Sequence, residues 1–139
     1  MKAYLSLSYS KRRSIENEIS VINDILNSFQ IEAFIFVDQY SFQQDEEKKM
    51  MHQTLSDIDE CDFLIAEVSD KAIGVGVEVG YAKAKNKPII YLRHSTAEHS
   101  TTISGVSDYS IFYNDINDLK GRLSTILKSI LVDQKSYSS

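Results

Sequence analysis

The sequence has one cysteine, one proline and no apolar run near the roughly 18 residues that a membrane span requires. With Cys61 alone, no intramolecular disulfide can form, which fits a reducing compartment. The opening residues, MKAYLSLSYSKRR, lack the long apolar core and the small-residue cleavage site of a signal peptide. We therefore expect a cytoplasmic protein without a membrane segment.

Positive charge is also scarce, because the net charge is -5 and the lysines and arginines are scattered along the chain. This disfavours a stripe of phosphate contacts along a nucleic-acid duplex. An acidic protein can still bind one small phosphate through backbone amides and one or two arginines. The histidines, His52, His94 and His99, show no paired metal-ligand spacing, so we predict neither a metal site nor a cofactor.

The length of 139 residues suits one domain, and the chain shows neither a repeat nor an internal linker. We expect a single domain over residues 1–131 and a polar, frayed tail over residues 132–139. Apolar periodicity predicts strands over residues 3–8, 31–37, 63–68, 88–92 and 110–113. It predicts helices over residues 13–29, 45–59, 74–85 and 116–131, the first capped by Ser10 or Ser14. The intervening residues 38–44 and 96–107 are predicted as loops.

Strands that alternate with helices predict an α/β fold, a doubly wound, five-stranded, mostly parallel sheet with helices on both faces. This is the Rossmann-like or flavodoxin-like arrangement, which binds ligands at the carboxyl ends of its strands. We therefore expect the segments that follow the strands to surround one cleft. These segments are residues 8–13, 38–42, 69–78 and 93–100.

The stretch from Asp62 to Arg93, DFLIAEVSDKAIGVGVEVGYAKAKNKPIIYLR, carries the clearest chemical pattern. Its glycines follow G-x-G-x-x-x-G, which is not the dinucleotide fingerprint, and no P-loop lysine is present. Gly74 and Gly76 allow a ligand to approach the backbone closely. Glu78 lies among apolar residues in the first turns of a helix, where the helix N-terminus favours the ionised carboxylate. It could be a nucleophile or a ribose-binding group, and an ordinary helix-stabilising glutamate is an equally good interpretation.

This stretch resembles the nucleoside 2-deoxyribosyltransferase superfamily, and it is most similar to the Rcl-like branch of 2'-deoxynucleoside 5'-monophosphate N-hydrolases. The family block has the form D-x-x-x-A-E-V followed by G-V-G-x-E-x-G-x-A. The matching residues are Asp62, Ala66, Glu67, Val68, Gly74, Val75, Gly76, Glu78, Gly80 and Ala82. The resemblance implies that Glu78 is the catalytic nucleophile.

Two weaker matches extend the resemblance over residues 2–105. The family opens with Y-x-x-x-S and a loop ending in arginine, which Tyr4, Ser8 and Arg13 match. This implies that Tyr4 lines the sugar pocket and that the loop holds the 5'-phosphate. The hydrolase pattern S-x-x-I-x-G begins here at Ser100, and its serine reaches the phosphate bound by the neighbouring subunit. The resemblance therefore implies a homodimer.

The chain departs from the family at two positions. Thr54 stands where the family has a second acidic residue, and Asp57 could replace that acid only if the helix register shifts. Ala72 stands where the hydrolases have a serine and the transferases an aspartate. Asp70 occupies the same turn and could act differently. These departures indicate a divergent substrate or an impaired enzyme.

We predict an N-glycosidase that cleaves the base from a (2'-deoxy)nucleoside 5'-monophosphate. Its catalytic residues would be Glu78, Tyr4 and Asp57. The substrate and its phosphate would be bound by Ser8, Arg12, Arg13, Ser69, Asp70, Gly74, Gly76 and Ser100. Arg93 is a further phosphate candidate, and Tyr40 and Phe42 could stack on a base. The alternatives are a nucleoside 2-deoxyribosyltransferase, a catalytically weak nucleotide-binding sensor and a TIR-like NAD-cleaving signalling domain.

Overall fold

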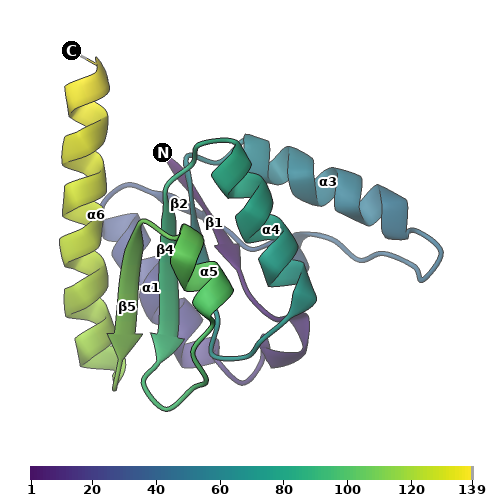
Figure 1. Cartoon of the computed structure of the whole chain (residues 1–139), viewed down its shortest axis with the longest axis horizontal. Coiled ribbons are helices and arrows are strands. Elements are labelled where there is room, and N and C mark those ends of the chain that lie inside the picture. The colour runs from purple at the N-terminus through teal and green to yellow at the C-terminus, as the bar shows by residue number, and fades with distance from the viewer. Residues whose placement is uncertain (139) are drawn as a thin grey trace.

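The computed structural model describes residues 1–138, with side chains described up to residue 134. Within this part of the chain, five parallel strands form one sheet in the order β2-β1-β3-β4-β5 (Figure 1). The strands are β1 (Lys2–Ser6), β2 (Glu32–Phe34), β3 (Phe63–Glu67), β4 (Ile89–His94) and β5 (Tyr109–Tyr113). The predicted doubly wound α/β fold is confirmed, and the sheet is parallel throughout.

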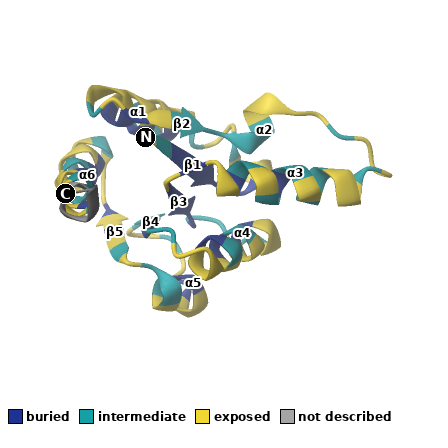
Figure 2. Cartoon of the chain, turned by 90° about the horizontal axis from the view of Figure 1, so that it is seen from above, coloured by how far each residue is buried: buried dark blue, intermediate teal, exposed yellow. Residues whose placement is uncertain are grey.

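Helices cover both faces of the sheet. They are the short 3-10 helix η1 (Tyr9–Lys11), α1 (Glu16–Ser28), α2 (Phe36–Gln39), α3 (Glu47–Asp59), α4 (Ile73–Ala84), α5 (Thr101–Val106) and α6 (Ile116–Ser138). Figure 2 shows α1 and α6 on one side of the sheet and α4 and α5 on the other. None of the helices in the described residues is long and apolar enough to cross a bilayer.

Alternating residues of the strands supply two separate cores. On β1, Leu5 packs into the core under α1 and α6, and Tyr4 packs into the core under α3, α4 and α5. On β3, Ile65 and Leu64 divide in the same way. Every residue of β3 is buried, as expected for a strand that helices cover on both faces.

The strand order reverses direction between β1 and β3, which pair in register from Ala3↔Phe63 to Ser6↔Ala66. In open parallel sheets of this kind, the crevice outside the carboxyl ends of such a strand pair is the usual ligand site. The chain segments that follow Ser6 and Glu67 therefore border the expected site. These segments lead into η1 and into α4.

Two local predictions in the amino-terminal half were wrong. The strand predicted to reach Val37 ends at Phe34, because only three of its residues pair with β1, and Phe36 begins α2. Neither Ser10 nor Ser14 caps α1; the N-cap is Ile15, whose side chain offers no acceptor. The Oγ of Ser14 instead donates to the carbonyl of Lys11 at 2.8 Å.

The carboxyl-terminal half differs from prediction at two places. The predicted loop over residues 96–107 contains α5, because the Oγ of Ser100 accepts the N–H of Ile103 at 3.4 Å and caps the helix. The last helix was expected to end at Leu131, and α6 continues to Ser138. Most of the predicted polar tail is thus helical in its backbone, and residue 139 lies outside the described residues.

Candidate active site

Glu78 and Tyr4 meet on the same side of the sheet. Glu78 lies in the second turn of α4, and its carboxyl group is hydrogen-bonded to the hydroxyl of Tyr4 on β1. Tyr4 is 1% exposed. A cavity of about 30 Å³ adjoins the pair. It is lined by Tyr4, Leu5, Leu7, Ile35, Phe36, Val37 and Glu78.

Burial raises the pKa of Glu78 to about 7, and the hydrogen bond from Tyr4 partly opposes this rise. The helix N-terminus was expected to favour the ionised carboxylate. Its influence fades beyond the first helical turn, and Glu78 stands in the second, so burial dominates. The pKa of Tyr4 is raised by burial and by the charge of Glu78, so Tyr4 stays protonated and can donate. A carboxyl group poised near neutrality, held by one donor, is suited to nucleophilic or acid–base work.

The two glycines before Glu78 differ in what they offer. A Cβ atom on Gly74 would stand 3.9 Å from Oε1 of Glu78, so Gly74 borders the carboxylate directly. Its amide belongs to the first turn of α4, where N–H groups have no acceptor within the helix. The amide of Gly76 already donates to the carbonyl of Ala72 at 3.4 Å. Gly76 therefore leaves open space but does not offer the free amide expected of it.

Asp57 lies on the Tyr4 side of α3. Its Oδ1 accepts from Nε2 of Gln53 at 3.0 Å and from the hydroxyl of Tyr40 at 3.5 Å. Its Oδ2 is buried and has no hydrogen-bond partner within the described residues. The charge of Asp57 contributes to the raised pKa of Tyr4. Thr54 is 4% exposed and donates to the carbonyl of Met50 at 2.9 Å, so a neutral side chain fills that position.

Aromatic side chains surround this part of the site. The Tyr4 ring stacks on Phe34 at a centroid distance of 5.7 Å, and Phe36 stacks on Phe42 at 5.9 Å. The ring of Tyr40 contacts Phe34, Phe36 and Phe42. Tyr40 and Phe42 thus pack against the chain itself. Phe34 and Phe36 also form this site, which the sequence did not predict because both belong to an apolar run typical of a strand.

A second cavity, of about 180 Å³, brings together Ser8, Ser69 and Asp70. Glu67 also lines it, and Lys11 is the single basic residue among its lining residues. The carboxylate of Glu67 is buried, which raises its pKa. Two acidic side chains beside one lysine oppose the binding of a phosphate at Ser69.

Glu67 faces α1, on the opposite side of the sheet from Glu78. It accepts the N–H and the hydroxyl of Ser69 at 2.6 and 3.0 Å, and the hydroxyl of Tyr113 at 3.1 Å. The Oγ of Ser69 in turn accepts the amide of His94 at 3.0 Å. This network joins β3, β4 and β5 where they end, and it fixes the turn that leads into α4.

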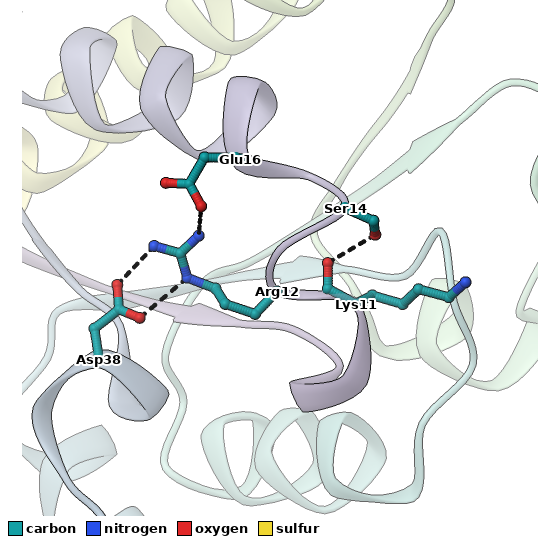
Figure 3. A network of polar contacts seen from close by, with 5 residues as sticks. All are labelled: Lys11, Arg12, Ser14, Glu16 and Asp38. Carbon is teal, nitrogen blue, oxygen red and sulfur yellow. Dashed lines mark hydrogen bonds and ion pairs between the residues drawn. The ribbon is translucent and has the colours of Figure 1, made fainter.

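The arginines have different surroundings. Nε and Nη2 of Arg12 donate to the two carboxylate oxygens of Asp38 at 3.1 and 2.8 Å, and Nη1 donates to Glu16 at 2.7 Å (Figure 3). Arg13 is exposed. Arg93 stacks on Phe112 at 4.4 Å. The Nη1 of Arg93 donates to three backbone carbonyls of its own loop, so this arginine holds a loop together and is not free for phosphate.

Ser100 lies beside the start of α4 in its own chain. A third cavity, of about 290 Å³, is lined by Val68, Lys71, Ala72, Ile73, Gly76, Ser100, Thr102 and Ile103. Ser100 is 9% exposed, and its amide donates to the hydroxyl of Tyr91 at 3.0 Å. Among the described residues, no group of three or more His, Cys, Asp or Glu side chains is arranged to hold a metal ion.

The sequence of this chain matches a known family over nearly its whole length. Residues 4–134 match the model of the nucleoside 2-deoxyribosyltransferase family. A protein of Thermofilum pendens is 24% identical over 91% of this chain and 95% of its own length. A protein of Syntrophotalea carbinolica is 56% identical, and that match spans only 30% of this chain and 29% of the relative. Both relatives are named 2'-deoxynucleoside 5'-phosphate N-hydrolase 1, with that activity assigned provisionally.

Two solved structures share the fold. The CMP N-glycosidase BcmB of Clostridium botulinum superposes with a TM-score of 0.65 at 22% identity, over 90% of this chain and 99% of that one. A 2-deoxyribosyltransferase of Bacillus psychrosaccharolyticus gives a TM-score of 0.65 at 15% identity, over 86% and 90% of the two chains. The resemblance seen in the sequence is confirmed, and with it the expectation of an enzyme. The chain belongs to the nucleoside 2-deoxyribosyltransferase family.

Proposed function

We propose that this chain is an N-glycoside hydrolase that releases the base from a 2'-deoxynucleoside 5'-monophosphate, with Glu78 as its nucleophile. The observation that carries the proposal is the carboxyl group of Glu78 on α4, half-buried and hydrogen-bonded to Tyr4 in the middle of β1. Family membership supports the reaction class, and the names of the two sequence relatives support a nucleotide substrate.

The reaction proceeds in two displacements at C1' of the sugar. In the first, a carboxylate oxygen of Glu78 forms a bond to C1', and the bond from C1' to the base nitrogen breaks. The base leaves with the electron pair and takes up a proton. In the second, water attacks C1', a proton is lost, and the Glu78 carboxylate is regenerated as the 5-phosphorylated sugar departs. Only the ionised form of Glu78 can begin this sequence.

Other residues bind and orient the substrate in this proposal. Tyr4 donates to Glu78 and lines the sugar pocket. Asp57 takes the place of the acidic residue that the family has at the position of Thr54, since the buried Oδ2 of Asp57 has no partner among the described residues. The residues proposed to bind the substrate or its phosphate remain Ser8, Arg12, Arg13, Ser69, Asp70, Gly74, Gly76 and Ser100. Ser8, the arginines and the amide of Gly74 carry the larger share, because Glu67 and Asp70 surround Ser69 with negative charge.

The protein acts as a homodimer in the cytoplasm in this proposal, with Ser100 reaching the phosphate bound by the second subunit. The support for a dimer is an apolar surface on α4 next to the Ser100 cavity, where Ile73 is 91% exposed and Val77 is 47% exposed. Neighbouring exposed apolar side chains are a common feature of surfaces that contact another protein.

A deoxyribosyl transferase is the second candidate, because the matching family model carries that description. The first displacement is then the same, and a second base replaces water at C1'. The two activities therefore differ in the acceptor and share Glu78. Only the need for an added base separates them in an assay.

The decisive experiment is a substrate panel with chromatographic detection of the free base. The panel holds ribo- and deoxynucleoside monophosphates, their nucleosides and NAD, each with and without an added base. We expect base release from deoxynucleoside monophosphates alone, lost in Glu78→Ala and retained in Glu47→Ala, which removes an exposed carboxylate of α3. Release that requires an added base indicates the transferase. Thermal stabilisation by a nucleotide without release indicates a sensor, and release from NAD indicates a signalling enzyme. Release that survives Glu78→Ala rejects the mechanism.

A further inference from the structure

The cavity beside Glu78 and Tyr4 is narrow in this structure. Its volume of about 30 Å³ equals the space of roughly one water molecule. Pockets that bind small ligands usually measure about 300–1,000 Å³. The sugar of a nucleotide fits beside Glu78 only if part of the cavity wall moves. The wall opposite Glu78 comes from Leu7, after β1, and from residues 35–37, which begin α2.

One ion pair connects these two parts of the wall. Asp38 directly follows the wall residue Val37, and Arg12 directly follows η1 in the segment that continues from Leu7. The Arg12–Asp38 pair is bidentate, with N···O distances of 3.1 and 2.8 Å. Its geometry, visible in Figure 3, is that of a strong charge-assisted contact. The Arg12–Glu16 contact, by contrast, stays within one segment, since the two residues are four apart.

Arg12 carries one positive charge and contacts two carboxylates, those of Asp38 and Glu16. Two further cations, Lys11 and Arg13, flank Arg12 in the same loop, so the loop as a whole can receive an anion. The side chain of Arg12 is 18% exposed, so breaking its pair with Asp38 leaves two donors of the guanidinium without an acceptor, while Glu16 keeps its contact with Nη1. A phosphate monoester offers a replacement acceptor, because its oxygens match the fork of a guanidinium as well as a carboxylate does. A nucleoside without phosphate offers no such group.

We propose that Asp38 is a specificity-determining residue of this site. Its ion pair with Arg12 holds the Glu78 cavity in its narrow form, and the 5'-phosphate of the substrate widens the cavity by taking the place of Asp38 on Arg12. Substrates without a phosphate therefore meet a cavity too small for their sugar. This inference rests on the proposed function, because it assumes a phosphorylated substrate, and it adds the residue that makes the phosphate necessary.

The first test compares the best monophosphate of the panel with its parent nucleoside. In wild type, we expect kcat/KM for the monophosphate to exceed that for the nucleoside by a large factor. We expect Asp38→Asn to lower this ratio by about tenfold, mainly through faster cleavage of the nucleoside, which is the factor that one charge-assisted hydrogen bond is worth. Glu16→Gln is the matched control, because it removes a carboxylate from the same arginine and leaves the link intact. A ratio that is unchanged in Asp38→Asn, or lowered equally in both variants, overturns the proposal.

The second test needs no catalysis and uses inorganic phosphate as the probe, measured by calorimetric titration. Asp38→Asn frees two donors of Arg12, so we expect it to bind phosphate about tenfold more tightly than wild type, with a much smaller gain in Glu16→Gln. Adding Arg12→Gln to Asp38→Asn should abolish the gain. An affinity that does not change in Asp38→Asn overturns the inference. If wild type releases no base from any substrate, the proposed function fails, and this titration still decides the role of Asp38.

Arg12→Lys is a further variant that keeps the positive charge and loses the bidentate geometry. It should also lower the ratio of monophosphate to nucleoside cleavage, which separates loss of the link from loss of charge. Circular dichroism melting of each variant verifies that the fold persists. A ratio that is unchanged in a folded Arg12→Lys variant counts against the proposal in the same way as an unchanged ratio in Asp38→Asn.

Discussion

Glu78 is a carboxyl group on which burial and a hydrogen bond act in opposite directions. Burial disfavours the charged form and raises its pKa to about 7, and the Tyr4 hydroxyl donates to the charged form and lowers it. An exposed glutamate would be fully ionised at neutral pH, and it would also be hydrated and a weak nucleophile. Glu78 is ionised in about half of the molecules near pH 7 and is only partly accessible to water. This state favours attack on an electron-poor sugar carbon.

The pH dependence of catalysis follows from that pKa. Because only ionised Glu78 attacks C1' in the proposed mechanism, we expect kcat/KM to rise about tenfold per pH unit below pH 7 and to level off above it. In Tyr4→Phe the donor that stabilises the carboxylate is lost, so the inflection should move upward by about one unit. Initial rates of base release between pH 5 and pH 9 measure both profiles. An inflection near 4.5 in wild type, the ordinary pKa of glutamate, contradicts this account.

Glu78 also links stability to pH. Its pKa is about 7 in the folded state and 4.5 in the ordinary case, so the folded chain holds this proton more tightly than the unfolded chain. Ionisation of Glu78 therefore lowers the free energy of unfolding. The whole of this loss is present above pH 7, and it disappears as the pH falls below 4.5. We expect Glu78→Gln to raise the free energy of unfolding by roughly 1–3 kcal/mol at pH 8 and by less than about 1 kcal/mol at pH 5. Urea unfolding at the two pH values measures the difference, and an equal gain at both disproves the linkage.

At the scale of elements, the turn between β3 and α4 decides where Glu78 stands. Glu67 anchors that turn by accepting both donors of Ser69, and Ser69 in turn accepts from His94 at the end of β4. Tyr113 on β5 supplies a further donor to Glu67. The donors of Ser69 and Tyr113 point at one carboxylate, which explains why Glu67 is retained at a position that is 3% exposed.

Replacing Glu67 by glutamine puts an amide donor where only acceptor atoms fit. We expect Glu67→Gln to lower the free energy of unfolding by about 1–3 kcal/mol, the usual cost of a buried polar group without a partner. Glu98→Gln is the control, since the Glu98 side chain is 79% exposed in its pair with Lys71, and it should change stability by less than about 0.5 kcal/mol. Thermal melts of the two variants under identical conditions provide the comparison. Equal melting temperatures would show that the network around Glu67 contributes nothing to stability.

The longer elements could be predicted from the sequence because their patterns are local. The continuous apolar run of β3 and the helical spacing of apolar residues in α1 depend on near neighbours alone. The short helix α2 could not be predicted, because apolar Phe36 and Val37 look like the continuation of a strand. The six residues of α5 were missed because their only local signal is the cap at Ser100.

The residues of the site that belong to the family motif could be predicted from the sequence. The contacts between residues far apart in the sequence could not. Glu78 and Tyr4 carry the motif, and the structure brings their side chains together. The contact between Arg12 and Asp38 joins positions 26 apart, and no local pattern indicates it. The orientation of Glu67 could have been predicted, since alternation along β3 places it on the face of Phe63 and Ile65.

At the scale of the molecule, the sheet is covered on both faces, and α4 still carries an exposed apolar side. Ile73 is 91% exposed and Val77 is 47% exposed, and both lie on the helix that bears Glu78. A second copy of the chain that covers this side would bring its own residues to the rim of the Ser100 cavity, which Ile73 lines. The dimer in the proposed function and the position of Ser100 thus depend on the same surface.

We expect the wild-type protein to sediment as a dimer at micromolar concentration and Ile73→Asp to sediment as a monomer. The substitution places a charge in the apolar contact and barely affects the fold, because Ile73 is almost fully exposed within one chain. Asn23→Asp adds the same charge on exposed α1 and should leave the dimer unchanged. If Ser100 acts across the interface, Ile73→Asp also raises KM for the monophosphate, because its phosphate loses a contact. A wild-type monomer, or a monomeric Ile73→Asp variant with unaltered KM, places Ser100 outside the neighbouring site.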